Sequence, residues 1–292
     1  LSGKLKSVAP AFKINESPMV LNMPKERSPK KQKSAQSEGA SAAMTPFTHL
    51  SAGRINSIER FQSCLAGAEA FRIKNNRPLV TVSYAQSVDG SIATRSRQPI
   101  GLSGPESALL THQIRACCDA ILIGIGTLLA DDPRLNVRLV EGSSPQPIVL
   151  DTNLRTPLNA RLVKRSDTRP WIINAKDERS EQSLALQNAG SLPICCAASR
   201  DGKIDLHALM KILAEKHINS IMVEGGARVI TSFVNSGLVD QFVVTVSPRF
   251  VGGLPVIESD GLQPETHLKL VEVSYRNMGD DLIIWARPSR LR

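Results

Sequence analysis

Glu224 and the two glycines that follow it are the residues of this sequence that point most directly to chemistry. They close an apolar run, Ile221 to Val223, and precede apolar residues at helical spacing between Val229 and Val234. This pattern predicts a strand, a Gly-Gly turn and a helix. Because glycine has no Cβ, a ligand can approach the backbone there, and the N–H groups that begin a helix favour an anion. The stretch therefore predicts a phosphate-bearing cofactor beside a carboxylate.

A second set of charged residues follows an apolar run that ends in Gly-Ile-Gly. Its members are Asp131, Asp132, Arg134 and Arg138. Ligands of open α/β folds bind at the carboxyl ends of strands, where arginine can grip a phosphate and a carboxylate can accept from a hydroxyl or an amide. A solvated loop is the alternative interpretation. Arg115 could bind a phosphate in the same way, although it could also cap the last carbonyls of a predicted helix.

Strands and helices alternate along the part of the chain that would position these residues. Ser103 and Glu106 predict a capping box at the start of one helix. The expected helices are residues 54–76, 105–117, 206–215 and 227–236, with a short helical turn after residue 126. The expected strands are residues 79–84, 119–126, 148–151, 171–175, 194–197, 220–224 and the run from 241, with a closing hairpin of 268–276 and 281–287. This order predicts an α/β fold with a mostly parallel sheet and an antiparallel C-terminal edge.

Charge and composition divide the 292 residues into three parts. The first 50 residues hold eight basic and three acidic side chains, and so carry +5 of the net charge of +9. We interpret residues 1–53 as a disordered basic tail, 54–76 as a helical extension and 77–292 as the catalytic domain. Aromatic residues make up only 4% of the chain, which argues against a nucleic-acid partner. No apolar run is long enough to predict a membrane span.

Several well-known site motifs are missing from the sequence. It has no G-x-G-x-x-G that opens a βαβ unit, no P-loop, no G-x-S-x-G and no zinc-deaminase signature. Its five cysteines form no C-x-x-C pair, and its five histidines lack metal-ligand spacing. We therefore expect no metal site and a reduced, cytoplasmic setting. Organellar targeting by the basic tail is the alternative.

Six segments, taken together, resemble the riboflavin-biosynthesis reductases. This family comprises the reductase half of bacterial RibD proteins and the stand-alone fungal and archaeal reductases, and the resemblance covers about residues 78–287. It implies a dihydrofolate-reductase-like fold, although dihydrofolate reductases tend to have an apolar residue where Glu224 stands. The segments are VTVSYAQSVDGSIA, LSGPES, THQIRA, DAILIGIGTLLADDPRLNVRLV, PIVLDTNLR and IMVEGGARVITSFVNSGLVDQFVVTVSPRFVGG.

The resemblance also implies a reaction and a set of site residues. NADPH would reduce the ribosyl group of 2,5-diamino-6-ribosylamino-4(3H)-pyrimidinone 5′-phosphate to ribityl by hydride transfer to C1′. Asp131 and Glu224 are candidates for the catalytic acid, with protonation by water equally open. Cofactor contacts would come from Ala85, Thr127, Asp131, Thr152, Gly225, Gly226, Ala227, Arg228, Val229 and Ile230. Substrate contacts would come from Ser103, Arg115, Leu135, Arg138 and Glu224.

Three other functions remain alternatives to this reductase, and the family resemblance also implies an oligomeric state. The alternatives are reduction of the deaminated substrate, 5-amino-6-(5-phosphoribosylamino)uracil, activity on dihydrofolate, and a non-catalytic binding role. Bacterial RibD proteins often carry a Trp where this chain has Ile100 and Gly101, so the chain looks closer to the stand-alone reductases. The family resemblance implies a homodimer, for which Phe242–Val246 and the C-terminal hairpin are candidate surfaces.

Overall fold

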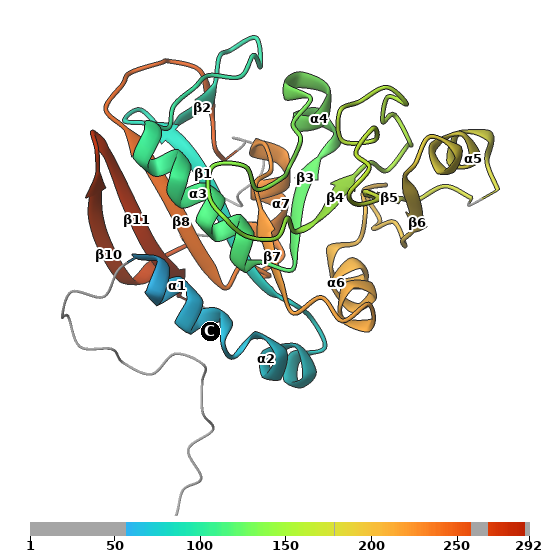
Figure 1. The fold of residues 1–292 in the computed structure, drawn as a ribbon, viewed down its shortest axis with the longest axis horizontal. Coiled ribbons are helices and arrows are strands. Elements are labelled where there is room, and N and C mark those ends of the chain that lie inside the picture. The colour runs from blue at the N-terminus through green and yellow to red at the C-terminus, as the bar shows by residue number, and fades with distance from the viewer. Residues whose placement is uncertain (1–56, 178, 258–267, 290–292) are drawn as a thin grey trace, which may run out of the picture. The chain divides into compact units, whose positions relative to one another are not determined.

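One large sheet organises the described part of the chain (Figure 1). The computed structural model describes residues 57–177, 179–257 and 268–289, all within the unit Met44–Arg292. The predicted tail, residues 1–53, lies outside the described residues. The strands of the sheet are β1 (Leu79–Ser87), β3 (Ala120–Gly124), β4 (Gln146–Leu150), β5 (Trp171–Asn174), β6 (Leu192–Cys195), β7 (Ser220–Val223), β8 (Gln241–Ser247), β10 (Leu270–Met278) and β11 (Asp281–Pro288).

The strand order of this sheet is β10-β11-β8-β1-β7-β3-β4-β5-β6. The strands from β8 to β6 run parallel to one another, whereas β11 is antiparallel to β8 and β10 is antiparallel to β11. Two short strands, β2 (Ser91–Ala93) and β9 (Leu254–Pro255), pair separately. The predicted fold class, a mostly parallel sheet with an antiparallel C-terminal edge, is therefore confirmed.

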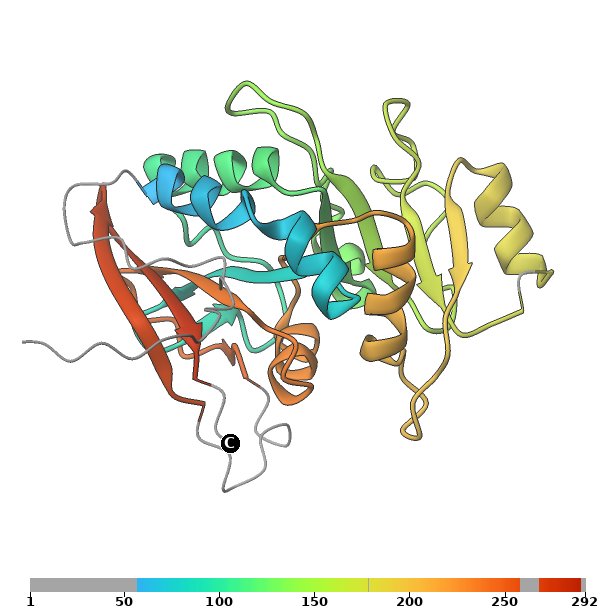
Figure 2. The same ribbon diagram turned by 90° about the horizontal axis from the view of Figure 1, so that it is seen from below.

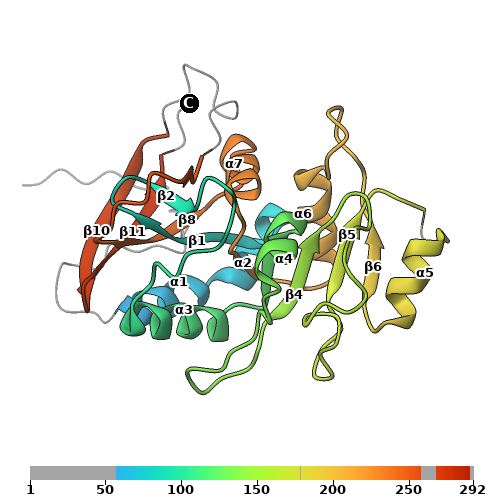
Figure 3. The same cartoon turned by 90° about the horizontal axis from the view of Figure 1, so that it is seen from above.

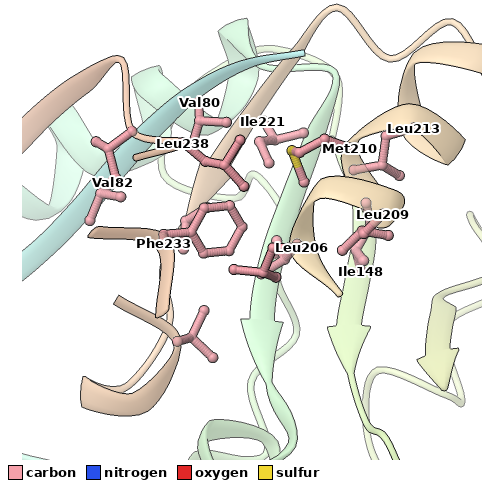
Figure 4. Packing of buried hydrophobic residues seen from close by; sticks show 14 of the residues in the cluster. Val80, Val82, Ile148, Leu206, Leu209, Met210, Leu213, Ile221, Phe233 and Leu238 are labelled. Atoms are coloured by element: carbon pink, nitrogen blue, oxygen red, sulfur yellow. The ribbon is translucent and has the colours of Figure 1, made fainter. Parts of the chain in front are cut away.

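Helices cover both faces of the sheet (Figures 2 and 3). On one face, Phe233 of α7 packs between Val82 of β1 and Leu206 of α6 (Figure 4). On the opposite face, α1 and α3 lie side by side, and Phe61 of α1 lies 5.9 Å from the ring of Trp285. The helices are α1 (Ser57–Leu65), α2 (Ala68–Asn75), α3 (Pro105–Cys117), α4 (Ile125–Asp131), α5 (Glu181–Asn188), α6 (Leu206–Glu215) and α7 (Ala227–Asn235). None of these helices combines the length and apolar character needed to cross a membrane.

Two predicted elements differ from the structure near the ends of the described chain. The described part of the expected helix 54–76 consists of two helices, because the chain leaves the helical conformation at Gly67, the N-cap of α2. Strand β8 is paired on both sides, by β1 and by β11, and Phe242 and Val243 are buried. The expectation that Phe242–Val246 offers a surface to a second copy is therefore wrong.

The N-terminus of α3 is capped by a residue far away in the sequence. The predicted capping box is wrong: Gly104 is the N-cap residue, and no side chain of the cap accepts a hydrogen bond. Instead, the buried Asp281 carboxylate of β11 accepts from the Gly104 N–H at 2.7 Å and from the Ser107 hydroxyl. A carboxylate at this position accepts hydrogen bonds from otherwise free donors, and its negative charge interacts favourably with the positive end of the helix. It also fixes α3 to the antiparallel edge of the sheet.

Replacing Asp281 with alanine removes a buried acceptor from two donors. We expect the free energy of unfolding to fall by roughly 2–3 kcal/mol, since both a helix cap and charged hydrogen bonds are lost. Asp280, the exposed neighbour, provides the matched control, because Asp280→Ala should change stability by no more than about 0.5 kcal/mol. Chemical denaturation of both variants measures this difference. Equal losses in the two variants would contradict the role of Asp281 as a cap.

Candidate active site

A cavity of about 1430 Å³ lies at the carboxyl ends of the parallel strands. It is lined by the last residues of β3 and β4, by Glu224 directly after β7, by the second half of β1, and by the starts of α4 and α7. Residues of the loop 199–205 and the first two residues of α6 line it as well. This position is the one at which open α/β sheets bind their ligands.

Two glycine-bounded helix starts form one wall of the cavity. Helix α4 has Gly124 as its N-cap and α7 has Gly226, and neither cap makes a side-chain hydrogen bond to its helix. The Thr127 hydroxyl of α4 accepts from the Gly226 N–H at 3.0 Å, which joins the two helix starts. A Cβ built on Gly226 would lie 3.2 Å from this hydroxyl. Gly226 and Thr127 thus pack closely against each other on a cavity wall where two helix N-termini meet.

Val229 explains why the neighbouring strand ends are glycines. A Cβ on Gly225 would lie 2.5 Å from Val229 Cβ, and a Cβ on Gly124 would lie 2.6 Å from Val229 Cγ2. Any side chain at either position would push α7 away from the ends of β3 and β7. These glycines therefore set the approach of α7 to the sheet, while Gly226 faces the cavity.

Glu224 and Arg115 form a bidentate ion pair at the cavity. Arg115 Nε donates to Glu224 Oε1 at 2.6 Å, and Arg115 Nη2 donates to Oε2 at 2.5 Å. The two side chains are only 12% and 15% exposed. Burial lowers the pKa of Arg115, but the charge and hydrogen bonds of Glu224 outweigh this and raise it. Arg115 thus binds across to β7 and does not cap its own helix, which settles the alternative left open by the sequence.

His112, one turn before Arg115 on α3, joins this ion pair to the segment after α4. Its side chain is buried, and its Nδ1 accepts from the Arg138 N–H at 3.1 Å. Its Nε2 lies 3.5 Å from Arg115 Nη1, which also donates to the Asn136 carbonyl at 3.3 Å. Burial and the charges of Arg115 and Arg138 lower the pKa of His112 to about 4. Sequence reasoning missed His112, although its spacing of three from Arg115 placed both on one helix face.

The charged residues that follow β3 do not all lie at the cavity. Asp131 lines the cavity, and burial raises the pKa of its carboxyl. Asp132 instead accepts from the Arg161 N–H at 2.9 Å and pairs with the Arg161 side chain. Leu135 is buried in the core beside the sheet, and Arg138 is exposed outside the cavity. Only the first member of the cluster therefore faces the ligand space.

Most of the residues that the sequence analysis assigned to the site line one cavity. Ile230, Leu135 and Arg138 do not, and Ser103, which was expected to cap α3, does. The described residues hold no group of three or more His, Cys, Asp or Glu side chains arranged to bind a metal ion. The assigned residues on the cavity wall are Ala85, Ser103, Arg115, Thr127, Asp131, Thr152, Glu224, Gly225, Gly226, Ala227, Arg228 and Val229.

The fold and this cavity define an α/β protein with a large ligand site at the carboxyl edge of its sheet. Residues 78–284 match the family described as "RibD C-terminal domain". The chain therefore belongs to the RibD C-terminal domain family.

Individual relatives agree with this assignment. The chain is 33% identical to the 2,5-diamino-6-ribosylamino-4(3H)-pyrimidinone 5′-phosphate reductase of Methanothermobacter thermautotrophicus, over 71% of this chain and 97% of the relative. It is also 33% identical to the riboflavin biosynthesis protein RibD of Aquifex aeolicus, over 73% of this chain and 58% of the relative. The chain thus spans about three fifths of the length of the RibD proteins that it matches.

Solved structures share the fold. The riboflavin biosynthesis reductase Rib7 of Saccharomyces cerevisiae has a TM-score of 0.57 at 28% identity, covering 73% of this chain and 91% of Rib7. RibD of Acinetobacter baumannii has a TM-score of 0.67 at 21% identity, covering 78% of this chain and 63% of that protein. At this lower identity the second similarity concerns the fold alone.

Replacing Gly225 with alanine tests the close packing of α7. The added methyl group would meet Val229, so we expect a loss of roughly 1–3 kcal/mol in the free energy of unfolding. Gly126→Ala is the control, because a Cβ there meets no atom within 4 Å and should not lower stability. Thermal or chemical unfolding gives both values. A Cβ on Gly124 meets Val229 closely only through Cγ2, so the loss caused by Gly124→Ala should largely vanish in a Val229→Ala background, and an undiminished loss would contradict this account.

Proposed function

We propose that the protein is an NADPH-dependent reductase of riboflavin biosynthesis. Its substrate is 2,5-diamino-6-ribosylamino-4(3H)-pyrimidinone 5′-phosphate, whose ribosyl group it reduces to ribityl. The observation that carries this proposal is the cavity of about 1430 Å³ with a glycine-bounded wall on one side and the Arg115–Glu224 pair on another. Single small-molecule sites occupy roughly 300–1,000 Å³, so a cofactor and a substrate fit side by side. The name of the Methanothermobacter thermautotrophicus relative, which the match covers over 97% of its length, supports the choice of substrate.

The glycine-bounded wall suits the phosphates of the cofactor. The Gly226 N–H already donates to Thr127, and the start of α7, which lines the cavity, offers its positive end to an anion. Asp131 and Thr152, on the same cavity, would accept from or donate to the cofactor's polar groups. When bound, the nicotinamide supplies a hydride for C1′ of the opened ribose. The residues present therefore fit a reduced dinucleotide cofactor.

The wall that holds the Arg115–Glu224 pair suits the pyrimidine. The Glu224 carboxylate accepts hydrogen bonds from amino and amide N–H groups, and its bidentate contact with Arg115 fixes the direction in which its free lone pairs point. Because Arg115 is engaged with Glu224, we assign it to the orientation of Glu224 as much as to the 5′-phosphate. The roles of Leu135 and Arg138 as substrate contacts stay predictions from the family resemblance.

Reduction at C1′ requires a proton as well as a hydride. Burial raises the pKa of Asp131, so this carboxyl keeps its proton to a higher pH than an exposed aspartate does. Asp131 and Glu224 are therefore the proposed candidates for the proton donor, with protonation by water as the alternative.

Turnover assays with matched variants test this assignment. The protein should oxidise NADPH with the diamino-pyrimidinone, and more slowly with the deaminated uracil or with dihydrofolate. Asp131→Asn or Glu224→Gln should lower kcat by about 10²–10⁴-fold, the usual contribution of a positioned acid or base. Asp132→Asn is the control, because Asp132 binds Arg161 and should leave kcat within a few-fold of wild type.

Melting temperatures measured with and without NADPH accompany these assays. NADPH should stabilise the wild type and Glu224→Gln alike, since binding to the native state alone raises the melting temperature. A preference for the uracil would replace the proposed substrate, and full turnover in both site variants would show that the residues are wrongly assigned.

We also propose that the protein forms a homodimer through the C-terminal hairpin, in a cytoplasmic setting. Strand β10 is the last strand of the sheet, and its outer residues include exposed apolar side chains: Leu270, Val273 and Tyr275. An exposed strand edge with apolar side chains is a common pairing surface. Light scattering should give twice the chain mass of 31.6 kDa, and Tyr275→Lys should give a monomer. A wild-type protein with the mass of one chain would contradict the dimer.

A further inference from the structure

His112 lies outside the cavity, yet it contacts two elements that approach the proposed substrate site. It sits on α3 with 3% of its surface exposed. On one side its ring meets the backbone of Arg138, and on the other it meets the guanidinium of Arg115. A buried imidazole in such contacts has few ways to arrange its protons.

The contacts of His112 determine its protonation. Because Nδ1 accepts from the Arg138 N–H, the single proton of a neutral ring is on Nε2, and Nε2 and Arg115 Nη1 then face each other as two donors without a hydrogen bond. A second proton would remove the acceptor and place a positive charge 3.5 Å from Arg115 Nη1. Arg115 and Arg138 both oppose this charge, and Glu224, which favours it, is already paired with Arg115. The buried ring is therefore held neutral.

The segment that His112 holds is tied down mainly by side chains. The Arg115 side chain donates to the Asn136 carbonyl at 3.3 Å, and the Ser144 hydroxyl accepts from the Val137 N–H at 3.1 Å. The next N–H along the chain, that of Arg138, donates to His112. The segment belongs to no strand or helix, so each of these hydrogen bonds contributes strongly to holding its conformation.

We propose that His112 is a positioning residue for the reductase site. In its neutral form it holds residues 136–138 against α3, and so keeps the Asn136 carbonyl on Arg115 and Arg115 on Glu224. Through this chain of contacts His112 sets the direction of the carboxylate that meets the pyrimidine. The reaction itself rests on the proposed function, whereas the contacts of His112 do not.

Two substitutions separate the hydrogen bond from the bulk of the ring. His112→Asn keeps an acceptor, since its Oδ1 can take the place of Nδ1, and it has no titratable proton. His112→Leu fills a similar volume without an acceptor. Hydrogen exchange of residues 134–140, followed by mass spectrometry, reports whether the segment is held. Steady-state kinetics report KM for the pyrimidine and for NADPH separately.

The leucine variant should exchange at this segment about tenfold faster than wild type, as expected for the loss of one buried hydrogen bond worth about 1 kcal/mol or slightly more. Its KM for the pyrimidine should rise about tenfold, while its KM for NADPH stays within about twofold. The asparagine variant should recover most of both values. Unchanged exchange in the leucine variant, or equal defects in the two variants, would overturn the proposal.

Nitrogen NMR of ¹⁵N-histidine-labelled wild type provides a test that requires no variant to fold. At neutral pH, His112 should show an unprotonated Nδ1 and a protonated Nε2. A proton on Nδ1 would overturn the proposal. If the wild type lacks turnover with every substrate, the proposed function fails, while the exchange and NMR results still judge His112.

Discussion

The bidentate contact between Arg115 and Glu224 is the interaction on which the site depends. A charge buried to this degree is tolerated only with a partner and further hydrogen bonds, and breaking such a pair is far more costly than its net contribution suggests. The contact therefore fixes the end of β7 to the last turn of α3. Helix α3 is held at its other end by Asp281 of β11, so the helix spans the distance from the antiparallel edge to the centre of the sheet.

Strand β7 occupies the centre because it pairs with β1 on one side and β3 on the other. Its end leads through a short turn into α7, whereas β3 leads directly into α4, and the glycines at both places allow Val229 to pack against them. One carboxylate and one pair of helix starts are thereby brought to the same edge of the sheet. The chemistry of the two walls differs because one is built from backbone N–H groups and the other from charged side chains.

Local patterns were sufficient for the elements that carry this architecture. Helices α3 and α6 have the predicted bounds, and β7 and α7 end within one residue of them, because apolar periodicity depends only on neighbours in sequence. The predicted cap of α3 was wrong for the opposite reason: the N-terminal N–H groups donate to a carboxylate 177 residues away and not to the local Ser-x-x-Glu pattern. Helix α5 was not predicted, although the Ser180 side chain caps it by accepting from the Ser183 N–H. Its apolar residues, 184–186, are consecutive, so the sequence shows almost no amphipathic pattern there.

The segment after α4 shows why part of the site lay beyond sequence reasoning. Asp132 and Leu135 both have left-handed backbone angles, with φ of 41° and 51°, which cost of order 1–3 kcal/mol for residues other than glycine. Burial of the Leu135 side chain and the bonds from Arg161 to Asp132 offset this cost. Every one of these partners comes from a distant part of the fold. Sequence spacing therefore grouped Asp131 with Arg138, whereas the backbone turns between them direct one toward the cavity and leave the other outside it, with His112 holding the bend.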